Sequence, residues 1–211
     1  MFSRFADSLR SALRESLPGA EAHALMAPLS ASMAERMALM HKSDPRKGSV
    51  LILLYPDKGE IFILLILRAK YDGVHSGQVA FPGGKMEGTD KDLVETALRE
   101  TEEEIGIPRG DVSVLGTLTE LYIPASNFLV LPVVGTAPER PQFRLKKDEI
   151  ETLIEVDLPG ILNNPVTAKK TIRLADGRHR EVPYYNISGH HVWGATAMMI
   201  SELRAVLNKK A

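Results

Sequence analysis

Three glutamates, Glu100, Glu103 and Glu104, are spaced so that a helix would place them on one face. At about 100 degrees per residue, with Glu100 at zero, Glu103 lies near −60 and Glu104 near +40 degrees. Carboxylates gathered in this way bind hard divalent cations such as Mg²⁺ or Mn²⁺. The chain has no cysteine, so a metal here would have oxygen or imidazole ligands. The chemistry that this pattern favours is metal-assisted hydrolysis.

Local helix stability does not account for these glutamates. Glu100 and Glu104 are like charges four residues apart, and all three lie in the last turns, where the helix dipole disfavours negative charge. A bound cation would reverse both effects. Arg99 lies one turn before Glu103 and is expected to hold that carboxylate in place. Glu102 is expected to face solvent. A separate stripe is expected to face the core, formed by Val94, Leu98, Thr101 and Ile105.

The acidic helix is expected to run from Asp90 to Ile105, with Asp90 as its N-cap and Gly106 just after its end. A loop-rich stretch, residues 71–86, precedes it and contains Phe81-Pro82-Gly83-Gly84. Two successive glycines let the backbone turn sharply and come close to another group. The loop and the helix together indicate a functional site.

Strands are expected on both sides of this helix. The apolar runs Val50–Tyr55 and Ile61–Leu67 predict a hairpin around residues 56–59, and their nearly continuous apolar character indicates that both sheet faces are covered. The remaining elements are expected as strands at 112–122, 128–134 and 151–156, a hairpin of 172–174 and 181–187 around Asp176-Gly177, and a last helix at 193–207.

The first 42 residues predict helices, with breaks at Leu17-Pro18-Gly19 and at Pro28. Their first segment is either an amphipathic helix, from the spacing of its apolar residues, or a transit peptide, from its arginines and serines; the helix is preferred. The pattern as a whole predicts an α+β fold, an α/β/α sandwich with a mixed β-sheet. It divides the chain into an N-terminal helical extension, residues 1–46, and a catalytic domain, residues 47–211.

The segment from Gly84 to Ile107 resembles the signature of the Nudix hydrolases. It reads Gly84-x5-Asp90-x8-Arg99-Glu100-Thr101-x-Glu103-Glu104-x-Gly106-Ile107. It departs from the signature at Asp90, in the spacing before Arg99 and at Thr101, and no metal-ligand role is assigned to Asp90. The resemblance implies a Nudix-like α/β/α sandwich and metal-dependent hydrolysis of a diphosphate bond.

A second motif lies just upstream, in residues 64–68 and 75–84. It resembles the element that marks the coenzyme A pyrophosphatase branch of the family, with Ala69 and Asp72 at positions where serine and leucine are usual. The resemblance implies cleavage of coenzyme A or acyl-CoA to 3′,5′-ADP and 4′-phosphopantetheine or its acyl form. The alternatives are a pyrophosphatase for ADP-ribose or another nucleoside diphosphate derivative, and a Nudix-like ligand sensor without catalysis.

The resemblance also implies roles for individual residues. The expected metal ligands are Glu100, Glu103, Glu104 and the Gly84 carbonyl. Arg99, one helical turn before Glu103, is expected to orient that glutamate rather than contact substrate. Glu149 is preferred over Glu151 as general base, although a solvated surface glutamate is equally compatible with the spacing. The residues expected at the substrate are Arg68, His75, Gly83 and Gly84; a salt bridge remains the alternative for Arg68, and a structural role for His75.

Composition limits the remaining possibilities. Lysine and arginine number 26 against 27 aspartate and glutamate residues, which does not favour a nucleic-acid backbone binder. No apolar run approaches the roughly 20 residues that span a bilayer, and no secretory signal is present. We therefore expect a cytoplasmic enzyme that acts on a small molecule, with no nucleic-acid or membrane partner. The oligomeric state and the number of metal ions remain open.

Overall fold

The structure is a computed structural model that describes residues 1–27, 33–73, 75–164, 168–173 and 179–209. The predicted helix break at Pro28 and the predicted turn at Asp176-Gly177 lie outside these residues. The elements follow along the chain as α1 (Phe2–Leu13), α2 (Gly19–Ala24), α3 (Met33–Ser43), β1 (Arg46–Asp57), β2 (Glu60–Arg68), β3 (Val79–Ala80), β4 (Gly83–Lys85), α4 (Leu93–Ile105), the 3-10 helix η1 (Arg109–Asp111), β5 (Ser113–Thr117), β6 (Leu121–Ile123), β7 (Phe128–Thr136), β8 (Ile150–Asp157), α5 (Leu158–Leu162), β9 (Ala168–Arg173), β10 (His179–Ile187), β11 (His190–Trp193) and α6 (Gly194–Asn208).

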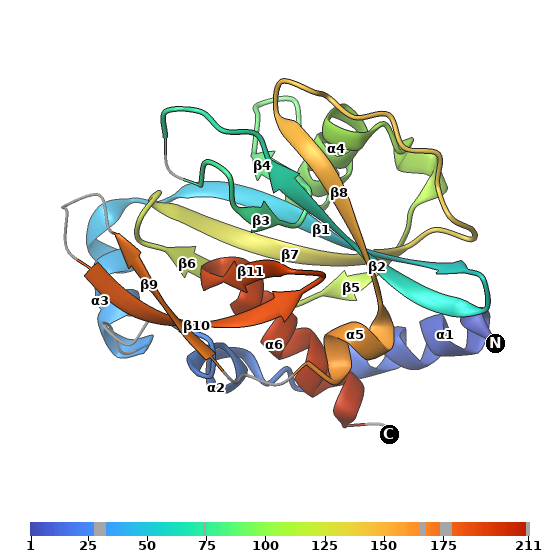
Figure 1. Cartoon of the computed structure of the whole chain (residues 1–211), viewed down its shortest axis with the longest axis horizontal. Coiled ribbons are helices and arrows are strands. Elements are labelled where there is room, and N and C mark those ends of the chain that lie inside the picture. Colours follow the sequence, from blue (N-terminus) through green and yellow to red (C-terminus); the bar gives the residue numbers. More distant parts are fainter. Residues whose placement is uncertain (28–32, 74, 165–167, 174–178, 210–211) are drawn as a thin grey trace.

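A mixed sheet forms the centre of the molecule (Figure 1). Its strands lie in the order β3-β2-β1-β7-β5, with β4 paired to β1, β6 to β7 and β8 to β2. Strand β1 runs parallel to β7, whereas the pairs β1–β2 and β2–β8 are antiparallel. The predicted mixed sheet and α+β class are confirmed.

Strands β1 and β2 form the hairpin that their apolar runs predict. Asp57 pairs with Glu60, so the two residues Lys58 and Gly59 make the turn. Their φ angles are 50° and 85°, as a type I′ hairpin turn requires. The turn is tighter than predicted, because Pro56 and Asp57 still belong to β1.

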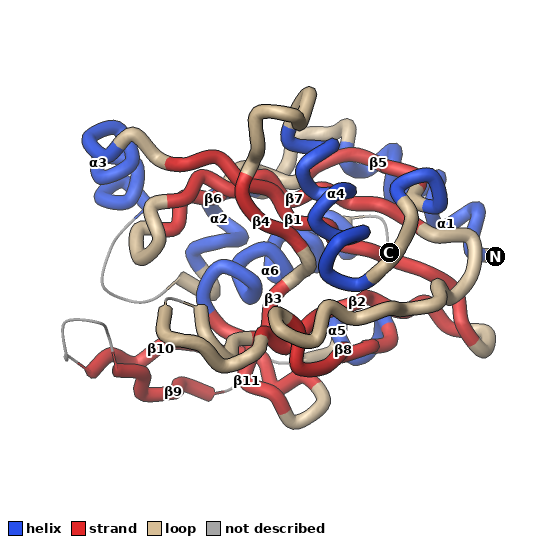
Figure 2. The backbone as a smooth tube through the Cα atoms, turned by 90° about the horizontal axis from the view of Figure 1, so that it is seen from above, coloured by secondary structure: helices blue, strands red, loops and turns tan. Residues whose placement is uncertain are grey.

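Different helices cover the two faces of the sheet. The odd-numbered side chains of residues 51–55 pack with Ala97 and Ile105 of α4. The even-numbered ones pack in the cluster that holds Leu9 of α1 and Leu203 of α6. Helix α4 lies over β1 and β4, as the view from above shows (Figure 2). The continuous apolar run of β1 thus reflects burial on both faces, which confirms the predicted sandwich.

The N-terminal helices share this second core with α6. Leu9 and Leu13 of α1, together with Met26 after α2, are buried in it. The apolar spacing in the first segment therefore marks a structural helix, as predicted. The boundary between an extension of 1–46 and a domain of 47–211 stays a prediction. Within the described ranges, no helix combines the length and apolar character needed to cross a lipid bilayer.

Two strand predictions are wrong in part. Residues 112–122 do not form one strand, because β5 ends at Thr117 and β6 begins at Leu121. Between them, the N–H of Thr119 donates to the side-chain carboxylate of Glu202. The C-terminal hairpin gains a third strand, β11, and forms a separate sheet in the order β11-β10-β9. Sequence periodicity did not indicate β11, because its residues, His190 to Trp193, alternate too briefly.

Glu202 of α6 joins three segments that are distant in sequence. It is fully buried, and its carboxylate accepts hydrogen bonds from the N–H of Gly19 at 3.1 Å and from the hydroxyl of Thr119 at 2.6 Å. Its Oε2 lies 2.9 Å from Nε2 of His23, which is 1% exposed. Burial alone would raise the pKa of Glu202, but the hydrogen bonds from His23 and Thr119 outweigh it and hold that pKa below the usual value.

We expect Glu202→Gln to lower the free energy of unfolding by about 2 to 4 kcal/mol, because an amide cannot accept all these donors in a buried site. Chemical denaturation at pH 7 measures the effect, with Glu21→Gln on the exposed face of α2 as matched control. The contribution of a depressed carboxyl pKa is present above the unfolded value of 4.5 and is lost as the pH falls through the folded value. The difference between parent and variant should therefore shrink below pH 4.5; a constant difference would contradict the assignment.

Candidate active site

The acidic helix α4 begins at Leu93 rather than at Asp90. Its N-cap is Asp92, whose Oδ1 accepts a hydrogen bond of 2.8 Å from the N–H of Glu95. The prediction that Asp90 caps the helix is wrong. The helix ends as predicted at Gly106, which has a left-handed φ of 77°.

Asp90 instead forms a buried ion pair with Arg99. The Nε and Nη2 groups of Arg99 donate to the two carboxylate oxygens of Asp90 at 2.8 and 3.0 Å. Asp90 also accepts hydrogen bonds from the N–H of Glu87 and the hydroxyl of Thr96. The guanidinium holds the pKa of Asp90 well below its usual range. Sequence reasoning missed this partnership, although Asp90 is the middle acid of the signature and could have been paired with its arginine.

Arg99 also faces two of the site glutamates. Its Nη1 lies 3.0 Å from Oε1 of Glu100 and 3.4 Å from both carboxylate oxygens of Glu103. Its Nη2 donates to the carbonyl of Lys85 at 2.9 Å. The predicted contact with Glu103 is therefore present, but the shorter, bidentate contact is with Asp90. Arg99 ties the acidic helix to strand β4 and to the segment between them.

The two glycines of the predicted loop lie in the short strand β4, which pairs antiparallel with β1. The N–H of Gly83 donates to Oε2 of Glu104 at 2.9 Å. A Cβ at Gly84 would lie 2.5 Å from the carboxyl carbon of Glu100. Any larger residue at this position would displace that carboxylate, so the glycine permits the close approach of strand and helix.

The three site glutamates differ in exposure. The side chain of Glu104 is 1% exposed, that of Glu100 16% and that of Glu103 49%. Burial raises the pKa of Glu104 to about 7, although the charge of Arg68 opposes the shift. Burial also raises the pKa of Glu100. The helical wheel predicted a shared face but not the burial of Glu104, because that burial comes from β4 and β2 rather than from α4.

Arg68 lies at the end of β2 and approaches the most buried glutamate. Its Nη1 is 3.6 Å from Oε1 of Glu104, an ion-pair distance that is too long for a hydrogen bond. Its Nε is buried and has no hydrogen-bond partner in the described part of the chain. The salt bridge considered from the sequence is present, and the Arg68 side chain is partly exposed, at 24%.

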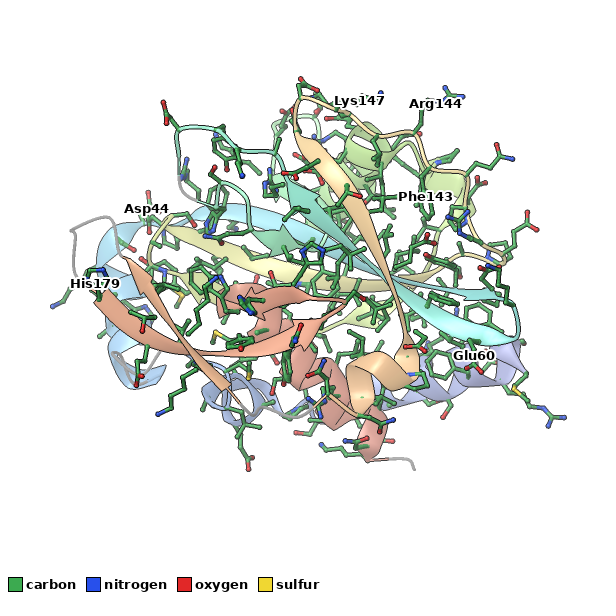
Figure 3. All side chains as sticks on the ribbon, viewed as in Figure 1. Asp44, Glu60, Phe143, Arg144, Lys147 and His179 are labelled. Atoms are coloured by element: carbon green, nitrogen blue, oxygen red, sulfur yellow. The ribbon has the colours of Figure 1, made fainter. Side chains whose placement is uncertain are left out.

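The segment before β8 runs along the end of the acidic helix. The N–H groups of Arg144 and Lys146 donate to the carbonyls of Ile105 and Glu104 at 2.8 and 2.9 Å. Figure 3 shows Arg144 and Lys147 on this segment, at the edge of the molecule near α4. A Cβ at Gly106 would come within 2.6 Å of the Cβ of Arg144. The glycine thus serves both the helix end and the approach of this segment.

Glu149 follows directly and lies within electrostatic reach of the site. Burial has the largest effect on the pKa of Glu100 and Glu104, and an arginine beside each has the next largest. The negative charge of Glu149 is a smaller effect that raises both pKa values. Its carboxylate is 2.5 Å from Nζ of Lys146, and its side chain is 40% exposed. Glu151 is exposed in β8, and among the described residues no ion pair or hydrogen bond joins it to the site glutamates. The role of Glu149 as general base stays a prediction.

His75 lies in the loop between β2 and β3 and has an unusual backbone conformation, with φ of 75°. Its Nδ1 is 3.1 Å from Oε1 of Gln78, which fixes the ring within its own loop. Within the described residues no hydrogen bond or ion pair joins His75 to the acidic helix. The structure brings Arg68, Gly83 and Gly84 against the glutamates, but the proposed contact of His75 with a substrate stays a prediction.

The donors at this site suit Mg²⁺ or Mn²⁺ in kind, because they are carboxylate and backbone oxygens. Across the described ranges, no three carboxylate or imidazole groups already surround one point closely enough to coordinate a cation. Glu100 and Glu103 face Arg99, and Glu104 faces Arg68 and Gly83. Coordination would therefore exchange contacts with Arg99, Arg68 and the Gly83 N–H for contacts with the metal.

Comparison with known proteins gives a consistent match. The family described as NUDIX domain matches residues 45–174. The uncharacterized Nudix hydrolase NudL of Yersinia enterocolitica is 38% identical over 147 residues, which are 69% of this chain and 74% of that protein. NudL of Photorhabdus laumondii is 35% identical over 161 residues, 76% and 85% of the two chains. The crystal structure of the M. smegmatis Nudix hydrolase RenU has a TM-score of 0.54 at 19% identity and covers 79% of this chain and 88% of that one, a likeness of fold.

Asp90→Asn should lower the free energy of unfolding by about 2 to 3 kcal/mol, because the buried charge of Arg99 would lose its bidentate anionic partner. Asp92→Asn is the matched control: it makes the same chemical change two residues away, and asparagine caps a helix as well as aspartate. Denaturant unfolding of both variants at pH 7 measures the difference. Equal stabilities would show that the Asp90–Arg99 pair does not hold the helix in place.

Proposed function

This chain belongs to the Nudix hydrolase family, and from that premise we propose that it hydrolyses the diphosphate bond of coenzyme A or acyl-CoA. The products would be 3′,5′-ADP and 4′-phosphopantetheine or its acyl form. The observation that carries the proposal is the face of α4 on which Glu100, Glu103 and Glu104 lie against the glycine strand β4. Helix energetics alone disfavour that arrangement.

We assign the cation site to Glu100, Glu103 and Glu104, with the Gly84 carbonyl as a further oxygen. These residues would hold Mg²⁺ or Mn²⁺, and the chemistry supplied there would be polarisation of the diphosphate and a lower pKa for the attacking water. Arg99 keeps the Glu100 and Glu103 carboxylates at the surface of the helix through its pair with Asp90. The chain thus supplies an acidic surface for the cation, and the positive charge held there would favour charge development on the diphosphate.

Glu149 is our candidate for the group that takes the proton from the attacking water. Its carboxylate is partly exposed and close enough to influence the charge state of Glu100 and Glu104. Lys146 pairs with it, which holds the carboxylate beside the end of the acidic helix. Glu151 remains the weaker candidate, because it is exposed and makes no contact with the site among the described residues.

Arg68 supports the choice of a polyphosphate substrate. A guanidinium has five N–H donors, and that of Arg68 makes one ion-pair contact while its Nε has no partner in the described part of the chain. Planar donors of this kind match phosphate oxygens. The resemblance of residues 64–68 and 75–84 to the coenzyme A branch favours coenzyme A. The departures at Ala69 and Asp72 favour the second candidate, a pyrophosphatase for ADP-ribose or another nucleoside diphosphate derivative.

Glu103→Gln and Glu104→Gln should each lower kcat for the diphosphate substrate by about 100-fold or more, as the loss of a charge-stabilising group does. Glu102→Gln is the matched control, because Glu102 pairs with Arg109 at 2.7 Å instead of facing the site. Steady-state rates in Mn²⁺ and in EDTA measure the effect. Hydrolysis that persists in chelator or in both site variants would reject the mechanism, and a folded parent that binds but never hydrolyses a diphosphate ligand would favour a sensor.

The substrate is tested by competition among coenzyme A, its 3′-dephospho form and ADP-ribose, with the products identified by mass. We expect kcat/KM for coenzyme A to exceed the other two by at least about tenfold, roughly 1.4 kcal/mol. A protein with a net charge of only −1 must recognise the 3′-phosphate through a local cation. Preference for ADP-ribose would reject the coenzyme A assignment, and Ala69→Ser with Asp72→Leu would then be the first variants to test.

A further inference from the structure

The pairing of Arg68 with Glu104 crosses from the sheet to the acidic helix at the deepest point of the site. The Glu104 side chain is 1% exposed and that of Arg68 is 24% exposed, so the carboxylate is buried and its cation is partly in contact with solvent. In the described part of the chain, Arg68 is the residue that forms an ion pair with Glu104. The pair therefore balances a buried negative charge with a partly exposed positive one.

A buried carboxylate needs such a balance, because an isolated buried charge costs several kcal/mol. Two groups favour the ionised form of Glu104, the guanidinium of Arg68 and the N–H of Gly83. The N–H is fixed in strand β4 and serves one oxygen, Oε2. The other oxygen, Oε1, faces Arg68, and it is the one that a cation would have to reach.

The backbone of Arg68 is held firmly while its side chain is not. Its N–H donates to the carbonyl of Gln78 at 3.1 Å, and the residue pairs with Ile150 of β8 next to an irregularity in the strand register. In the described part of the chain, the polar contact of its side chain is the ion pair of 3.6 Å with Glu104. Because this distance is too long for a hydrogen bond, the contact is easier to exchange than the one that the Gly83 N–H makes with Oε2.

We propose that Arg68 is a positioning residue that competes with the divalent cation for Glu104 and thereby sets the metal affinity of the site. The inference rests on the proposed function in one respect, that Glu104 is a ligand of that cation. When a cation takes over Oε1, the donors of Arg68 become available to the diphosphate. Arg68 would then weaken metal binding in the free enzyme and strengthen substrate binding in the metal-bound enzyme. Binding of the metal and binding of the substrate would thus be coupled.

The test is the affinity for Mn²⁺ alone, measured by titration calorimetry on EDTA-treated and dialysed full-length protein at pH 8.5. Arg68→Gln should bind Mn²⁺ more tightly than the parent, on the order of fivefold, because the competing ion pair is gone. Arg68→Lys, which keeps a cation, should stay within about twofold. Mn²⁺ should also raise the Tm of Arg68→Gln by more than it raises that of the parent.

Arg109→Gln is the matched control, because it removes the same charge from an arginine that pairs with Glu95 and Glu102 of α4. If Arg109→Gln raises the affinity for Mn²⁺ as much as Arg68→Gln does, the effect comes from the change in net charge, and the inference is overturned. Unchanged or weaker binding in Arg68→Gln, in a parent that binds Mn²⁺ and hydrolyses a diphosphate, would overturn the inference and leave the function intact. A parent without Mn²⁺ binding would overturn both. Arg68→Met retains the apolar stem and carries the same expectation if the glutamine variant does not fold.

Discussion

The concentration of negative charge in the last turns of α4 is the constraint around which the neighbouring structure is arranged. Repulsion between glutamates four residues apart costs about 0.2 to 0.5 kcal/mol, and the helix dipole adds about 0.3 to 1 kcal/mol. Burial of one carboxylate, Glu104, costs several kcal/mol and is the dominant effect. Arg68 and the Gly83 N–H offset part of this cost, and Arg99 offsets the charge of Glu100 and Glu103. Arg99, Arg68 and Gly83 belong to different elements, α4, β2 and β4. The negative charge that would bind a cation therefore also requires these three elements to lie close together.

Glycine at two positions makes that meeting possible. Gly84 lets β4 approach Glu100 so closely that a Cβ would overlap the carboxylate, and Gly106 lets the 144–146 segment cross the helix end. The Asp90–Arg99 pair then fixes the distance between strand and helix, since Arg99 also donates to the Lys85 carbonyl. Backbone proximity and a buried ion pair therefore act on the same few residues. This explains why the glycines and the charges lie within one short stretch of sequence.

Sequence reasoning succeeded where the determinants are local. The hairpin of β1 and β2, the helix end at Gly106 and the shared face of the three glutamates follow from periodicity and residue conformation alone. It failed where a side-chain partner elsewhere in the structure determines the local conformation or burial. Asp90 does not cap α4 because Arg99 takes its carboxylate, and the strand expected at 112–122 breaks because Glu202 captures Thr119. The burial of Glu104 belongs to the same class, because it depends on β2 and β4. The spacing of residues within one helix does not show which groups from other segments will contact that helix.

The irregular pairing of β2 with β8 connects the two sides of the site. Leu67 pairs with Thr152 and Arg68 with Ile150, so Glu151 is the extra residue of a bulge. A bulge bends its strand and changes the direction of the side chains that follow. Just beyond it, the N–H of Ala69 donates to the carbonyl of Glu149 at 2.8 Å. The candidate phosphate-binding arginine and the candidate base are thus held on adjoining strand ends, one beside the buried glutamate and the other beside the exposed end of the acidic helix. Glu151 is the residue that the bulge leaves unpaired, and its side chain is exposed, whereas the backbone of Glu149 is tied to the chain directly after Arg68.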